Sequence, residues 1–164
     1  MAREQPAVLD AGPAIVLEEL SRSEALEAFA KVYCADVVRA ELSKLPAWFA
    51  GKVETVSTTP SQRKTCATLA KAHDISFPDA MNKVVAGSLG LPTILTDDLD
   101  LREASRDEGF TPVGTIGILL RAGKIGILSK EEVLDALDAI PARSSLYITR
   151  KLLDEAKIRV RKEL

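Results

Sequence analysis

The stretch LPTILTDDLDLREASRDEG, residues 91–109, contains the features that decide the fold class. Its first six residues form a short apolar run with β-branched side chains, which is typical of a buried strand. The segment LDLREASRDEG, residues 99–109, predicts a helix closed by Gly109. Three aspartates, Asp97, Asp98 and Asp100, stand within four positions where strand and helix meet. A strand, an acidic turn and a helix in this order predict one unit of an α/β fold.

Strands and helices alternate on both sides of this stretch. Two helix starts are well marked: Thr59 precedes Pro60, and Ser129 with Glu132 forms a capping box. We expect strands at 6–10, 31–35, 51–58, 91–96 and 110–115, and helices at 14–20, 23–29, 36–45, 59–73, 76–90, 99–109, 116–124, 132–140 and 145–164. This order predicts a three-layer α/β/α domain with a mainly parallel sheet. We place that domain at residues 1–128 and a helical C-terminal extension, packed on it, at 129–164.

Composition indicates a globular chain without unusual bias. Of 164 residues, 46% are hydrophobic and 28% charged, and no apolar run reaches the ~20 residues that a membrane span needs. Acidic residues near the N-terminus argue against a secretory signal, so we expect a cytoplasmic protein with no membrane contact. Cys34, Cys66 and His73 stand singly, which makes zinc chemistry and histidine triads poor candidates.

The charge is uneven along the chain. Residues 143–164 hold 7 of the 22 basic but only 3 of the 24 acidic side chains. A basic end on an acidic body favours contact with nucleic acid or an acidic partner, while a solvated helix face explains the pattern equally well.

Several acids fall where parallel strands end. Ligands bind beyond the carboxyl ends of strands in such a sheet, and Asp10, Asp97 and Asp98 follow two of the expected strands. Each acid alone also has a structural explanation, since Asp79 and Asp98 could favour helix N-termini. Capping explains one aspartate per helix start, however, and not three in four positions. A Mg²⁺ or Mn²⁺ ion, which prefers carboxylate oxygens, explains the cluster better.

Four segments carry a family resemblance. VLDAGPAIVL, VVRAELSKL, PDAMNKVVAGSLGLPTILTDDLDLREA and VGTIGILLRAGKIGIL resemble, in order and spacing, the PIN-domain family, which includes the VapC toxins of toxin–antitoxin pairs. The last segment is similar to an uncharacterised branch in which the Gly-Thr-x-Gly helix start recurs. The resemblance covers about residues 7–128. It implies a PIN-like α/β/α fold with an acidic Mg²⁺ or Mn²⁺ pocket.

The resemblance also implies roles for individual residues. By position, Asp10, Glu41, Asp79 and Asp98 match the catalytic and metal-binding acids of the family, and Asp97 and Asp100 match further metal-binding acids. Thr96, Arg102 and Arg106 are the expected substrate contacts, and Arg121 and Lys124 are additional basic candidates. This chain departs from the family at Gly12, where many members have Ser, Thr or Asn. Asp79 matches by position rather than by its neighbours.

The implied activity is metal-dependent hydrolysis of RNA phosphodiesters by water, without a covalent intermediate. The expected partners are an RNA substrate, a cognate antitoxin protein and a second copy in a homodimer. The alternative is a catalytically inactive PIN-like module that acts by binding. A haloacid-dehalogenase phosphatase, a receiver domain and a dinucleotide-binding fold all fit less well. The phosphatase, for example, needs an acid where this chain has Gly12.

Overall fold

A five-stranded parallel sheet forms the centre of the computed structural model, which describes residues 3–164. The strands are β1 (Ala7–Leu9), β2 (Val32–Ala35), β3 (Val53–Val56), β4 (Thr93–Leu95) and β5 (Thr111–Val113). Their spatial order is β3-β2-β1-β4-β5, and every neighbouring pair is parallel. All three residues of β1 are fully buried, as expected for a central strand covered on both faces.

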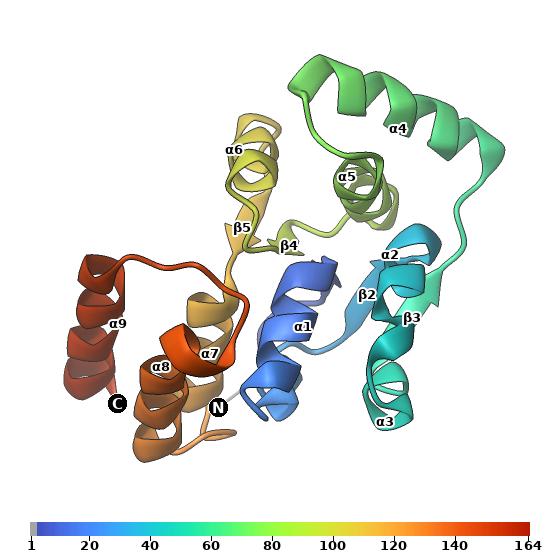
Figure 1. Ribbon diagram of the computed structural model, residues 1–164. Helices are drawn as coiled ribbons and strands as arrows, with labels where there is room; N and C mark the ends of the chain where they lie inside the picture. Colours follow the sequence, from blue (N-terminus) through green and yellow to red (C-terminus); the bar gives the residue numbers. More distant parts are fainter. Residues whose placement is uncertain (1–2) are drawn as a thin grey trace.

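Helices cover both faces of this sheet (Figure 1). They are α1 (Ala11–Glu19), α2 (Asp36–Glu41), α3 (Ala47–Ala50), α4 (Pro60–His73), α5 (Phe77–Leu89), α6 (Leu99–Asp107), α7 (Thr115–Lys124), α8 (Lys130–Arg143) and α9 (Arg150–Glu163), with 3₁₀ turns η1 (Ser23–Ala28) and η2 (Leu42–Lys44). In Figure 1, α4, α5 and α6 lie on the upper side of the sheet, and α1, α7, α8 and α9 on the lower side. The predicted three-layer α/β/α class is therefore confirmed.

Local capping signals set several helix starts as the sequence predicts. The Thr59 side chain accepts a hydrogen bond from the backbone N–H of Gln62, whose own side chain accepts from the Thr59 N–H. Ser129 and Glu132 form the same reciprocal pair at the start of α8. In each case two N–H groups that the helix leaves unpaired gain partners.

Some expected elements differ in the structure. The segment 23–29 forms a short 3₁₀ turn rather than an α-helix, and 36–45 divides into α2 and η2. The short α3 was not expected. The last helix begins at Arg150 rather than at residue 145, because Thr149 supplies its N-cap. Helix α8 continues through Pro141 to Arg143, since the proline stands too near the helix end to stop it.

The C-terminal helices join the same packing as the rest of the chain. Helix α8 packs against α7, and α9 packs against both. Leu153, Ala156 and Val160 bury one face of α9. Whether 129–164 is a separable extension stays a prediction. No helix within residues 3–164 is long and apolar enough to cross a membrane.

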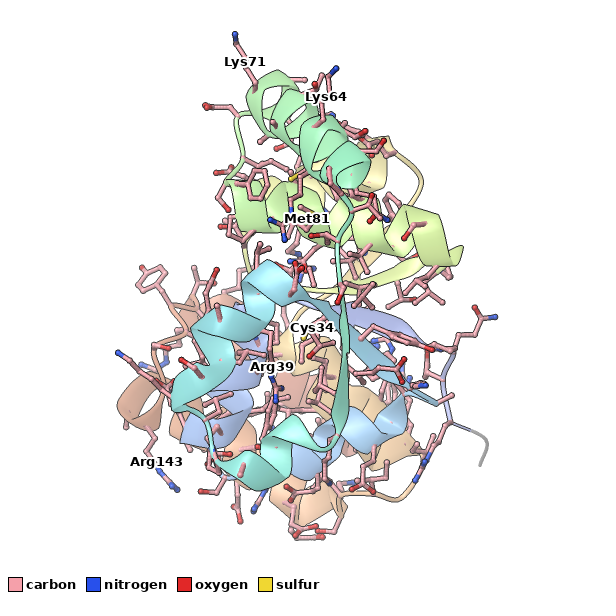
Figure 2. All side chains as sticks on the ribbon, turned by 90° about the vertical axis from the view of Figure 1, so that its right-hand side faces the viewer. Cys34, Arg39, Lys64, Lys71, Met81 and Arg143 are labelled. Carbon is pink, nitrogen blue, oxygen red and sulfur yellow. The ribbon has the colours of Figure 1, made fainter. Side chains whose placement is uncertain are left out.

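Side chains of α4 and β2 differ in exposure. Lys64 and Lys71 point away from the body on the outer face of α4, whereas Cys34 lies inside, on β2 (Figure 2). Cys34 and Cys66 are both buried and unpaired. The acids that follow β1 and β4 lie at the carboxyl end of the sheet.

Candidate active site

Asp10 is the most deeply placed acid at the carboxyl end of the sheet. Pairing of β1 with β4 sets Leu9 opposite Leu95, so the residues that follow, Asp10 and Thr96, are neighbours. The Oδ1 atom of Asp10 accepts hydrogen bonds from the Ala11 N–H at 2.8 Å and from Asn82 Nδ2 at 3.2 Å. Its Oδ2 atom accepts from the Thr96 hydroxyl at 2.9 Å. Three donors therefore fix this buried carboxylate in one orientation.

The ionised form of Asp10 is nevertheless opposed by its surroundings. Burial, followed by the negative charge of Asp79, raises the pKa of Asp10 from 3.8 to about 6, and Glu41 adds to the effect. Burial and the charge of Asp79 also raise the pKa of Glu41, which stands at the end of α2. These acids thus act on one another across three separate elements of the chain.

Asp79 and Asp98 extend this group from the starts of α5 and α6. Asp79 lies in the first turn of α5, where its carboxylate accepts a 2.6 Å hydrogen bond from the Ser76 hydroxyl. Asp98 caps α6 by accepting from the Leu101 N–H. Burial raises the pKa of Asp79, and the charges of Asp98 and Asp100 raise it further.

We use the name acidic rim for the five carboxylates that this electrostatic coupling connects. They are Asp10, Glu41, Asp79, Asp98 and Asp100. As the side chains stand, no three Asp, Glu, His or Cys residues in the described part of the chain are grouped tightly enough to hold a metal ion.

Asp97 points elsewhere. Its Oδ1 atom accepts from the Thr115 N–H at 2.7 Å, and its Oδ2 atom accepts from the Thr115 hydroxyl at 2.6 Å. Both oxygens therefore serve the start of α7, and metal ligation by Asp97 stays a prediction. Two helices, α6 and α7, begin beside the cluster, and Asp98 and Asp97 each serve one of these starts, so helix starts account for two of the three aspartates and leave Asp100.

Thr96 also differs from its expected role as a substrate contact. It is fully buried, and its hydroxyl donates to Asp10 while accepting from the Asp98 N–H at 3.2 Å. Thr96 thus connects two acids of the rim and offers no surface to a substrate.

Asn82 is a site residue that our sequence analysis missed. It is completely buried, donates to Asp10, and leaves its own Oδ1 atom without a hydrogen-bond partner. The available signal was its position in α5, one helical turn after Asp79 and so on the same side of the helix.

The expected basic contacts lie beside the rim on α6 and α7. Arg102 and Arg106 line a cavity next to the rim, as does Arg121, which also lies 3.5 Å from a carboxylate oxygen of Glu4. Burial and the charge of Arg106 lower the pKa of Arg102. Lys124 is occupied by an ion pair with Glu163.

Comparison with known proteins identifies the family of this chain. A family model, DUF3368, described as a PIN domain, matches residues 6–162. The chain belongs to the PIN-domain family. The expectation drawn from the four sequence segments is thereby confirmed, and the match runs across the C-terminal helices as well.

Other comparisons add less. None of the curated proteins matches this PIN-domain chain significantly. A crystal structure of PAE2754 from Pyrobaculum aerophilum is similar over 69% of this chain and 91% of that one, with 18% sequence identity and a TM-score of 0.48.

PIN domains typically use divalent metal ions. The acidic rim offers the right kind of donor atom for such an ion, and its side chains would have to move closer together to share one. Every donor in it is a carboxylate oxygen, the type that Mg²⁺ and Mn²⁺ prefer. The raised pKa values of Asp10, Glu41 and Asp79 come first from burial and then from the charge of neighbouring acids, and a bound cation would offset that charge. Asp97 stands apart from the rim, because its charged neighbour is Arg102 and its two oxygens accept hydrogen bonds from Thr115.

Proposed function

We propose that this PIN-domain protein is a Mg²⁺- or Mn²⁺-dependent endoribonuclease. The observation that carries the proposal is the placement of four acids toward the carboxyl end of the sheet. Asp10 follows β1, Glu41 ends α2, Asp79 lies in the first turn of α5 and Asp98 caps α6. These residues come from four distant parts of the chain. Carboxylates that lie close enough to repel one another are typical of a site that binds a cation.

In this proposal Asp10 and Asp98 hold the ion, and Glu41 and Asp79 complete its surroundings. A divalent ion supplies the Lewis acidity for hydrolysis of a phosphodiester by water. Thr96 and Asn82 keep Asp10 in place through hydrogen bonds to its two oxygens. Glu41 and Asp79, whose raised pKa values favour proton uptake, are suited to accept the proton that the attacking water loses.

The alternative is a binding module without turnover. It is favoured by the fact that both oxygens of Asp10 already accept hydrogen bonds from protein groups. This arrangement is compatible with a structural carboxylate as well as with a catalytic one.

Cleavage of single-stranded RNA by the purified chain separates the two functions. We expect cleavage in Mg²⁺ or Mn²⁺, none in EDTA, and a loss of at least about 100-fold in Asp10→Asn and Asp98→Asn. Asp135→Asn is the matched control, because it makes the same change at an exposed position on α8. Metal binding without cleavage would favour the binding module, and equal cleavage by all variants would indicate contamination.

We further propose that the protein is the toxin of a toxin–antitoxin pair and forms a homodimer. Support comes from the sequence resemblance to VapC toxins and from exposed apolar side chains suited to partner contacts, Leu99, Leu152 and Ile158. Expression of the chain alone should arrest growth, and co-expression of a protein encoded beside it should restore growth. Unimpaired growth on expression of folded protein would reject the toxin role, and a strictly monomeric mass by light scattering would reject the dimer.

A further inference from the structure

The cavity beside the acidic rim that Arg102 and Arg106 line has a volume of about 460 Å³. Arginine side chains from three helices line it: Arg102 and Arg106 from α6, Arg121 from α7 and Arg159 from α9. We call this the arginine cavity. The chain between α8 and α9, which also contributes to its wall, crosses to the start of α9 (Figure 1). The C-terminal segment therefore completes a hollow that α6 and α7 begin.

Positive charge in the arginine cavity is only partly neutralised. Arg159 pairs with Glu163 and Arg121 with Glu4. Among residues 3–164, neither Arg102 nor Arg106 has a carboxylate within ion-pair distance, and both face the same cavity. Asp97, which shares the cavity wall, offsets part of the charge of Arg102 from beyond ion-pair distance, while its oxygens accept hydrogen bonds from Thr115. Two guanidinium groups that line one cavity and repel each other favour an anion there.

The Gly-Thr-x-Gly start of α7 makes room for these arginines. A Cβ on Gly114 would lie 2.5 Å from Arg102 Nη1 and 2.8 Å from Asp97 Oδ1. A Cβ on Gly117 would lie 2.9 Å from Val113 Cγ1 and 3.1 Å from Arg121 Nη1. The guanidinium groups of α6 and α7 thus lie directly on backbone that lacks side chains. This sequence feature has no part in the acidic rim, and seating the arginines accounts for it.

Exposed apolar side chains separate the arginine cavity from the acidic rim. Tyr147 is 91% exposed and Leu99 is 78% exposed. Both line the arginine cavity, and both also line the adjoining hollow that contains Asp98 and Asp100. An exposed aromatic ring between an acidic and a basic site is a stacking surface for a nucleobase.

We propose that the arginine cavity binds the RNA strand next to the bond to be cleaved, with a backbone phosphate at Arg102 and Arg106 and a base on Tyr147. The choice of RNA as the polyanion rests on the proposed nuclease function. Charge complementarity favours a phosphate, and the apolar ridge favours a nucleotide over free phosphate. The C-terminal segment then has a function beyond packing, since it supplies Tyr147 and Arg159.

Fluorescence anisotropy with a labelled single-stranded ten-nucleotide RNA tests this inference in EDTA, where nothing is cleaved. Arg106→Gln should weaken binding and lower the slope of log K against log salt by about 0.7, the value for one lost phosphate contact. Tyr147→Ala should weaken RNA binding at least about fivefold and leave the salt slope unchanged. Tyr147→Phe, which keeps the aromatic ring, should bind RNA as tightly as the wild type. Arg143→Gln removes an equal charge outside the cavity, from an exposed side chain (Figure 2), and should have the smaller effect.

RNA binding and RNA cleavage are measured separately, so this inference and the nuclease proposal can fail independently. RNA binding with these dependences in a protein that never cleaves RNA supports the arginine cavity and rejects the nuclease. Binding unaffected by Arg106→Gln and Tyr147→Ala rejects the cavity as the RNA site even if RNA is cleaved. Tighter binding of a labelled poly-glutamate peptide than of the RNA would assign the cavity to an acidic protein instead. Thermal unfolding of each variant confirms that it is folded.

Discussion

At the scale of single residues, the protonation of Asp10 links stability to pH. Its pKa of about 6 in the folded chain exceeds the ordinary 3.8, so the folded state binds this proton more tightly than the unfolded state. The stabilisation that results is complete below about pH 4 and is lost as the pH rises through about 6. Such a shift corresponds to about 3 kcal/mol at neutral pH.

Asp10→Asn should therefore remove much of this pH dependence in the absence of metal. Between pH 4 and pH 7, we expect the free energy of unfolding of the wild type to fall by up to about 3 kcal/mol more than that of Asp10→Asn, as measured by urea unfolding in EDTA. The exposed-site control Asp135→Asn should keep the wild-type dependence. If the free energy of unfolding depends on pH in the same way in Asp10→Asn and in the wild type, the pKa of Asp10 is not raised in the folded protein.

The site residues also show which contacts a sequence pattern can predict. Asp10 and Asp98 were found because acids after strands mark the carboxyl end of a parallel sheet. Asn82 was missed, since its partner Asp10 lies 72 positions away. The capping role of Asp97 depends on Thr115, 18 positions later, and on how α7 approaches the sheet. Such pairings follow from the register of distant elements, which no local pattern encodes.

At the scale of elements, the start of α7 depends on the missing side chain of Gly114. Gly114→Ala should destabilise the protein by about 1–2 kcal/mol, because the new Cβ would displace Arg102 and the capping carboxylate of Asp97. Gly87→Ala is the matched control: it lies inside α5 with nothing within 4 Å, so alanine should stabilise by about 0.5–1 kcal/mol. Urea unfolding of both variants measures the difference. A neutral or stabilising Gly114→Ala would contradict the close packing described for α7.

Elements with local signals were predicted well, and those decided by packing were not. The capping residues of α4 and α8 are within one turn of the groups they bind, so the sequence shows them directly. No capping residue in the sequence marks the division of 36–45 into α2 and η2. The start of α2 also depends on distant residues. Asp36 binds Thr58 and pairs with Arg63, both beyond β3, and thereby ties the start of α2 to that of α4.

At the scale of the whole molecule, the C-terminal helices and the sheet share one hydrophobic core. Buried residues of α8 and α9 belong to the same cluster as those of β1 and α7. We therefore expect a single cooperative thermal transition, with equal calorimetric and van't Hoff enthalpies. Differential scanning calorimetry measures both. A separate low-temperature transition would contradict this expectation and would support 129–164 as an independent extension.

The central claim is that Asp10, Glu41, Asp79 and Asp98 together bind one divalent ion, and Mn²⁺ titration followed by electron paramagnetic resonance tests it most directly. We predict one bound Mn²⁺ per wild-type chain, with affinity reduced at least about tenfold in Asp10→Asn and in Asp98→Asn. Asp97→Asn should bind Mn²⁺ like the wild type, because that carboxylate serves the start of α7. Equal Mn²⁺ affinity in the wild type, Asp10→Asn and Asp98→Asn, or no binding at all, would contradict the account.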